Sequence, residues 1–205
     1  MDTRFVLEKT IDSDIESVYR IRYRALRSIN AIPLCESEIC KDEFDDKPHA
    51  VTYSLKNDTT LIGTIRPVVR EPRLGWNDIP VTVTNRETLF QQLPEDATYI
   101  EVSRFAVDPD YSEKYARAGI ILLRAIIANA IYYDCDYIIA VINQRHLSFY
   151  SRFMKCDVLA ELEYCYGVNI SGHLVYLDVK NKMKCLLNDV SMLKMSDDDI
   201  ERLRI

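Results

Sequence analysis

A carboxylate and a hydroxyl occur two residues apart in one short, strand-like run of the chain. Glu101 and Ser103 lie in TYIEVSRFAV, residues 98–107, and side chains two apart on a strand share a face. Phe105 continues that face, whereas Arg104 is expected on the opposite one. A carboxylate on such a strand can take a proton from an attacking amine. The run is therefore a candidate catalytic strand; alternatively, Glu101 is a solvated residue and Arg104 a buried ion-pair partner.

Arginines also interrupt apolar patterns elsewhere. Arg22 falls on the apolar stripe of a predicted helix, and Arg66 and Arg104 fall inside strand patterns. Buried guanidinium groups need carboxylate partners, and the acidic stretch 42–46 is the natural source. We therefore predict an ion-pair network that orders this loop over the sheet and shapes the wall of an acceptor pocket. Its members are Arg22, Asp42, Asp45, Arg66 and Arg104.

The start of a long apolar segment offers a place for an anion. Residues 111–119 include Lys114, Arg117 and Gly119, and a helix N-terminus presents unpaired N–H groups and the positive end of a dipole, which together hold phosphate. The alternative is an ordinary helix start with two surface cations. The segment is not a GxxxxGK[ST] loop, so nucleotide hydrolysis has no support.

Two further sets of residues are weaker candidates. Asn143, His146 and Tyr150 lie between a buried strand and a predicted helix and could line a pocket; a histidine at a helix start is more often a cap or a surface residue. Cys156 and Cys165 are nucleophiles only in principle, because no cationic neighbours favour a thiolate. The six cysteines form no CxxC pair and no zinc-like spacing, so no metal site is predicted.

Composition narrows the class of protein. The chain of 205 residues is 48% hydrophobic and has a net charge of −6, which predicts one domain, 1–205, and argues against general affinity for nucleic acid or anionic membranes. The apolar run 118–133 is too short and too polar for a membrane span. The first residues lack the apolar run of a signal peptide, so we expect a cytoplasmic protein with reduced cysteines.

The periodicity of apolar residues predicts a mixed α/β sheet with helices on both faces. The expected strands are 4–9, 50–55, 61–69, 98–107, 137–142, 158–164 and 173–179. The expected helices are 14–29, capped by Ser13 and Glu16, 84–92, capped by Thr84 and Glu87, 113–133 and 144–154. Residues 196–205 are expected to form a peripheral tail with a weak helix.

The catalytic strand resembles a known family. Residues 99–109 are similar to the E-x-S-R-F strand of acyl-homoserine-lactone synthases, which have the GNAT N-acyltransferase fold. Residues 22–24 resemble the R-Y-R of their first helix, 42–45 their D-x-x-D loop and 63–66 their G-x-x-R strand. The resemblance spans roughly 15–110 and implies the GNAT-like fold.

The second half of the chain resembles a related branch. Residues 143–152 look like the N-x-R-H-x-x-F-Y-x-R segment of long-chain N-acyl amino acid synthases, and 166–169 look like their next segment. Leu26 and Ile32 stand near where the lactone synthases have aromatic residues, and Cys40 stands where they have a glutamate. These departures favour the amino acid branch over a lactone synthase that uses S-adenosylmethionine.

The resemblance implies a reaction. A long-chain acyl group passes from the phosphopantetheine thioester of acyl carrier protein to the amine of an amino acid, tyrosine in the best-known case. Glu101 serves as base, and Ser103 positions the donor. Backbone amides of Phe105, Ala106 and Val107 hold the oxyanion, and Lys114, Arg117 and Gly119 meet the phosphate.

No metal or bound cofactor is needed for this reaction. Residues 114–119 lack the glycine pattern of an acetyl-CoA loop, which makes acyl carrier protein the expected partner. Two alternatives stay open: an acyl-homoserine-lactone synthase, and a GNAT-like protein that binds an acylated carrier or small ligand without catalysis.

Overall fold

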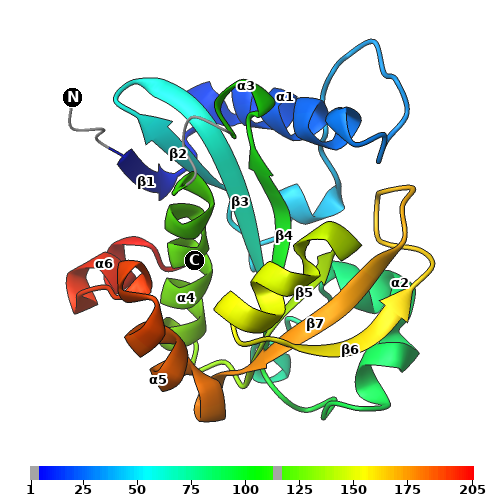
Figure 1. Cartoon of the computed structure of the whole chain (residues 1–205), viewed down its shortest axis with the longest axis vertical. Coiled ribbons are helices and arrows are strands. Elements are labelled where there is room, and N and C mark those ends of the chain that lie inside the picture. Colours follow the sequence, from blue (N-terminus) through cyan, green and yellow to red (C-terminus); the bar gives the residue numbers. More distant parts are fainter. Residues whose placement is uncertain (1–4, 113–116) are drawn as a thin grey trace.

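One mixed sheet forms the centre of the molecule. The computed structural model describes residues 5–112 and 117–205, and its seven strands lie in the order β1-β2-β3-β4-β5-β7-β6 (Figure 1). Every neighbouring pair is antiparallel except β4 and β5, which are parallel. The mixed sheet confirms the predicted class. The strands are β1 Phe5–Lys9, β2 Tyr53–Asn57, β3 Thr60–Arg70, β4 Tyr99–Val107, β5 Tyr137–Ile142, β6 Asp157–Leu162 and β7 Gly172–Asp178.

Helices cover both faces of the sheet, as predicted. α1 and α2 pack on one face against β3 and β4, and α4 crosses the other face with α5 and α6 beside it (Figure 1). The short α3 precedes α4. The helices are α1 Asp12–Ser28, α2 Pro80–Phe90, α3 Pro109–Ser112, α4 Ala118–Tyr132, α5 Val179–Asp189 and α6 Asp197–Arg202.

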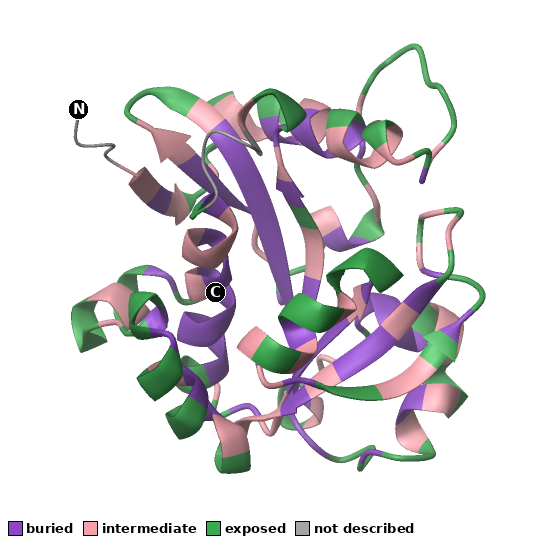
Figure 2. Ribbon diagram, in the orientation of Figure 1, coloured by how far each residue is buried: buried purple, intermediate pink, exposed green. Residues whose placement is uncertain are grey.

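α4 is buried on most sides, as its nearly unbroken apolar sequence predicts (Figure 2). It lies very close to β3: a Cβ added at Gly63 would come within 3.0 Å of Leu122 Cδ1. The buried side chain of Asn129 donates a 2.8 Å hydrogen bond to the carbonyl of Leu203, which fastens the C-terminal segment to the helix. No helix in the described part of the chain is long and apolar enough to cross a membrane.

β4 and β5 pair for only part of their length. Residues 99–102 of β4 face 137–140 of β5, and β4 then continues to Val107 with no strand on that side among the described residues. A bulge lies at the same level, because the β3–β4 register shifts between Thr64 and Arg66. Bulges bend a strand and increase its twist. The two parallel strands therefore part beyond residue 102 and leave a gap in the sheet.

The first two helices begin earlier than predicted. α1 starts at Asp12, and its N-cap makes no side-chain hydrogen bond, so the expected Ser13–Glu16 capping box does not form there. α2 starts at Pro80 rather than at residue 84. Proline suits the first turn of a helix, and the Thr82 hydroxyl accepts a 3.0 Å hydrogen bond from the Ile79 N–H.

Two regions in the second half also differ from prediction. Residues 144–154 form a 3₁₀ turn, Gln144–His146, and a π-turn, Phe149–Phe153, in place of one α-helix. α5 was not predicted, although Asp178 caps it by accepting a hydrogen bond from the Asn181 N–H. The expected helix 113–133 corresponds to α4, and its first turn at 113–116 lies outside the described residues.

Candidate active site

A cavity of about 740 Å³ opens where β4 and β5 part. Its wall combines the second half of β4, the C-terminal end of β5, the last turns of α1, the start of α4 and the β6–β7 loop. Distant parts of the chain thus meet at one site. The predicted site residues that line it are Arg22, Arg66, Glu101, Ser103, Arg104, Phe105, Ala106, Val107, Gly119, Asn143, His146 and Tyr150.

Other predicted site residues lie elsewhere. Asp42 and Asp45 are not part of the cavity lining and bind its arginines. Arg117 is exposed just before α4, and Lys114 lies outside the described residues. The described residues contain no group of three or more His, Cys, Asp or Glu side chains that could hold a metal ion.

Glu101 is a buried carboxyl group in the cavity wall. Its side chain leaves β4 toward α2, where Oε2 accepts a 2.8 Å hydrogen bond from the Val81 N–H. Burial raises the pKa of Glu101 to about 8, against the opposing effects of the Val81 hydrogen bond and of the charges on Arg66 and Arg104. A carboxylate with such a pKa is a far stronger base than an exposed one, and it suits proton transfer from an amine.

The raised pKa makes the pH profile a test of this group. A base must be ionised to act, so kcat at a saturating concentration of the amino acid, where ionisation of the free amine no longer contributes, should rise with pH and level off above about 8, the pKa of Glu101. Steady-state rates between about pH 5 and 10, spanning the ordinary carboxyl and amine ranges, would show it. A rate that is already constant from about pH 5 upward, near the ordinary carboxyl pKa, would rule out this assignment.

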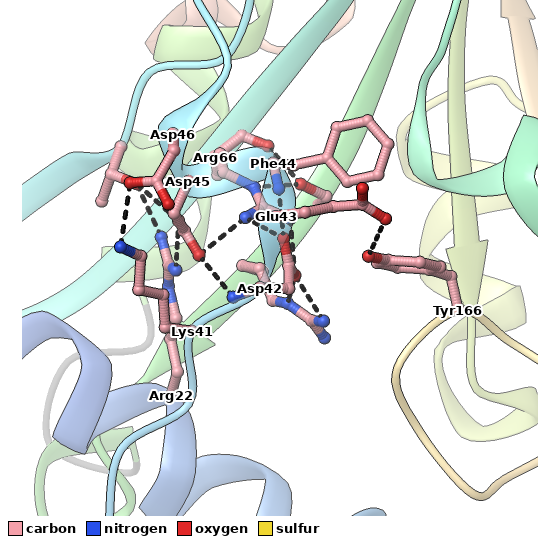
Figure 3. A network of polar contacts seen from close by, with 12 residues as sticks. Arg22, Lys41, Asp42, Glu43, Phe44, Asp45, Asp46, Arg66 and Tyr166 are labelled. Carbon is pink, nitrogen blue, oxygen red and sulfur yellow. Dashed lines mark hydrogen bonds and ion pairs between the residues drawn. The ribbon is translucent and has the colours of Figure 1, made fainter.

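The predicted ion-pair network is present and is centred on two aspartates (Figure 3). Asp42 Oδ1 lies 2.7 Å from Arg66 Nη1, and Asp42 Oδ2 lies 2.7 Å from Arg104 Nε. Asp45 Oδ1 lies 2.7 Å from Arg22 Nη1, and its Oδ2 lies 2.9 Å from Arg66 Nη1. Burial alone would raise the pKa of Asp42, but Arg66 and Arg104 outweigh it and lower the pKa to about 2.

The acidic loop is folded to present these aspartates. The Asp42 side chain accepts a hydrogen bond from the Phe44 N–H, and Asp45 accepts one from the Asp42 N–H at 3.0 Å. This reciprocal capping closes the turn Glu43–Asp46. The loop backbone and the ion pairs therefore hold each other in place.

The prediction that Arg104 points away from Glu101 and Ser103 is wrong. Arg104 has a left-handed backbone with φ of 47°, and the bulge breaks the alternation of β4. Its guanidinium therefore turns toward Asp42 on the network side. Simple strand periodicity assumes an unbroken ladder, and this strand does not have one.

The Ser103 hydroxyl makes both of its hydrogen bonds with Arg66. Its hydroxyl accepts a 3.0 Å hydrogen bond from Arg66 Nε and donates a 2.8 Å bond to the Arg66 carbonyl. The serine thus ties β4 to β3 at the bulge and orients the Arg66 side chain. Its closest interactions are with the network rather than with Glu101.

The far rim of the cavity comes from residues 143–150. The Asn143 side chain caps this turn by accepting from the Arg145 N–H, and His146 Nε2 lies 3.0 Å from Arg145 Nε. Burial, followed by the charge on Arg145, lowers the pKa of His146. Tyr150 is buried at the base of the turn.

The β6–β7 loop is a part of the wall to which the sequence analysis assigned no role. Tyr166 donates a 3.0 Å hydrogen bond to Glu43 Oε1 (Figure 3), and the Asn169 N–H donates a 2.7 Å bond to the Ala31 carbonyl. These bonds lay the loop across the cavity onto the acidic loop and the end of α1. Tyr166 followed by Gly167 in a hairpin loop was the sequence feature that could have indicated a role for this loop.

Comparison with known proteins decides the family. Residues 17–178 match the family model described as N-acyl amino acid synthase FeeM. The chain belongs to the FeeM family. It is therefore an N-acyltransferase, an enzyme that transfers an acyl group to an amine.

Solved structures of related proteins have the same fold. FeeM from uncultured soil microbes superposes with a TM-score of 0.73 at 23% identity, covering 91% of this chain and 97% of that one. The acyl-homoserine-lactone synthase LasI gives 0.65 at 12% identity, with 88% and 94% covered. BjaI, a CoA-dependent acyl-homoserine lactone synthase, gives 0.64 at 14%, with 98% of each chain covered. The curated protein sequences contain no match.

Proposed function

We propose that this FeeM-family enzyme transfers a long-chain acyl group from the thioester of acyl carrier protein to the amine of an amino acid. The observation that carries the proposal is the cavity at the β4–β5 gap, which combines a buried carboxyl group, Glu101, with the unpaired edge of β4. A base and backbone N–H groups at one place are what an aminolysis needs.

In the proposed reaction the amine nitrogen attacks the thioester carbonyl directly. The N–C bond forms as Glu101 takes the proton of the amine, and the tetrahedral intermediate collapses with cleavage of the C–S bond. The proton on Glu101 then passes to the departing thiolate. Amides between Phe105 and Val107, beyond the point where β5 leaves, are the proposed donors to the oxyanion. Ser103 assists by holding Arg66 and the bulge in place.

Apolar side chains on one side of the cavity favour a long acyl chain. A second, smaller cavity lies between α4, β5 and the π-turn, bounded by groups that include Ile126, Met154 and Leu177. It shares the wall residues Val102, Leu123, Ala140 and Tyr150 with the main cavity. A hydrocarbon tail placed against these shared residues would be partly removed from water.

A carrier protein is the proposed donor because exposed cations lie at the rim. Arg117 precedes α4, and Arg145 and Arg152 lie on the turns beside the cavity. Lys155, by contrast, is paired with Asp189 at 2.8 Å. Carrier proteins are acidic, as is this chain, so attraction must come from such a local patch. A carrier substrate and the free cysteines also fit a cytoplasmic enzyme.

The donor can be tested by charge reversal. The double variant Lys114→Glu and Arg117→Glu should lower kcat/KM for acyl carrier protein roughly tenfold or more and reduce its salt dependence, because rim charges steer association. The KM for the amino acid should be unchanged. Lys184→Glu, the same change at an exposed position on α5, is the control and should change neither value.

The same assay separates the alternatives. Incubation with acyl carrier protein thioester, acyl-CoA and a mixture of amines yields an N-acyl amino acid if the proposal holds. A lactone would indicate a homoserine-lactone synthase. Preference for acyl-CoA, the donor class named for BjaI, would refute the carrier proposal while leaving the acyltransferase intact.

A further inference from the structure

The buried network contains more positive than negative charge. Three guanidinium groups, of Arg22, Arg66 and Arg104, face two carboxylates, Asp42 and Asp45, which leaves one positive charge unbalanced. None of these side chains is more than 11% exposed. A buried charge without a counterion is costly, so this surplus favours an anionic ligand.

The hydrogen bonds show which arginine carries the surplus. Every guanidinium nitrogen of Arg66 has a partner, in Ser103, Asp42 or Asp45. Arg22 binds Asp45 and Thr52, and its unpartnered Nε is inaccessible. Arg104 contacts Asp42 through two atoms, Nε and Nη2. Nη1 of Arg104 has no hydrogen-bond partner among the described residues.

Arg104 is also the member of the network best placed to reach a ligand. Its side chain is 8% exposed, compared with 1% for Arg22 and Arg66, and it lines the cavity. The Tyr166 ring lies 5.9 Å from its Cζ. A Cβ at Gly167 would come within 2.5 Å of Nη2, so the loop backbone packs directly against the guanidinium.

The backbone at Arg104 bears a conformational cost for this placement. A left-handed φ in a non-glycine residue is uncommon and costs free energy, and at Arg104 it accompanies the turn of the guanidinium toward Asp42. Neighbouring acids do not pair with Arg104: Glu43 is exposed and accepts the Tyr166 hydroxyl, and Glu101 accepts its hydrogen bond from the Val81 N–H. Nη1 is therefore the donor left for a ligand, on a side chain that lines the cavity.

We propose that Arg104 binds the carboxylate of the acceptor, so that the enzyme acylates α-amino acids in preference to simple amines. The inference rests on the proposed function and adds to it a residue and a selection rule. In an α-amino acid the amine and the carboxylate share one carbon atom. Anchoring the carboxylate on Arg104 therefore holds the amine within the wall that also contains Glu101.

The test compares acceptors that differ only in the carboxylate. Tyrosine is paired with tyramine, and leucine with isopentylamine, with one acyl carrier protein thioester as donor. The wild type should favour the amino acid of each pair. In Arg104→Gln the ratio of the two kcat/KM values should fall about 10- to 100-fold, the range for losing a charge-assisted hydrogen bond. A ratio within one preparation is independent of the fraction that is folded.

Three further variants test whether the change in the ratio comes from Arg104. Arg104→Lys retains the charge and should keep part of the preference. Arg22→Lys, a change in the same network, and Arg145→Gln, a change at another arginine of the cavity wall, should leave the ratio near the wild-type value. An unchanged ratio in Arg104→Gln, or a collapsed ratio in Arg145→Gln, would overturn the inference while the proposed function stands. Acylation of tyramine alone by the wild type would overturn both.

Discussion

Replacing Glu101 by glutamine should lower kcat by about 10²–10⁴-fold, the usual contribution of a positioned general base. The amide of glutamine can still accept the hydrogen bond from the Val81 N–H that Glu101 accepts now, so the geometry of α2 and β4 should persist. What is lost is the ability to take a proton. Rates within about threefold of the wild type, far inside the expected range, would remove Glu101 from the mechanism.

The same variant should be as stable as the wild type or more stable. The folded-state pKa of Glu101, about 8, lies above the ordinary value of 4.5. The folded protein therefore holds a proton that the unfolded chain releases, and stability decreases as pH rises through this window. The glutamine variant does not lose stability in this way. The difference in Tm between the variant and the wild type should therefore grow from pH 5 to about 8. Glu163→Gln, at an exposed position, should show no such trend.

Replacing Asp45 by asparagine should destabilise the protein by about 3–5 kcal/mol, the cost of breaking a buried ion pair. The Asp45 side chain is fully buried between Arg22 and Arg66. The near-isosteric change preserves volume but leaves both guanidinium groups short of negative charge. Urea unfolding at neutral pH measures the difference directly.

A neighbouring residue supplies the matched control. Asp46 pairs with Lys41 at 2.9 Å, but its side chain is 70% exposed, and exposed pairs contribute about 0–1 kcal/mol. Asp46→Asn should therefore be nearly neutral. Equal effects at Asp45 and Asp46 would mean that the network does not stabilise the fold.

Local patterns were sufficient to predict much of the site. The run around Glu101 has the alternation of a strand, and arginines within apolar patterns require acids, which identified the partners at 42–46. Both inferences depend on short-range geometry and on the cost of burying charge. The orientation of Arg104 could not be predicted in this way, because the bulge that reverses it arises from pairing with β3.

Other features depended on contacts between distant segments. The β6–β7 loop reaches the cavity through Tyr166 and Asn169, whose partners lie more than 100 residues earlier. Residues 144–154 have helical spacing, yet they form two different turns, with Tyr150 and Met154 buried. By contrast, α5 could have been predicted from the sequence, because its apolar residues Val179, Met183, Leu186 and Leu187 have helical spacing.

The partial pairing of β4 and β5 has a consequence for how readily such an enzyme can change substrates. Past residue 102 the two strands share no ladder, so a wider or longer occupant can separate them without sacrificing any bond between their backbones. Variation in acyl length can then come from single side chains in the shared wall, such as Val102 and Ala140. The rest of the sheet stays intact, which makes this gap a practical starting point for engineering.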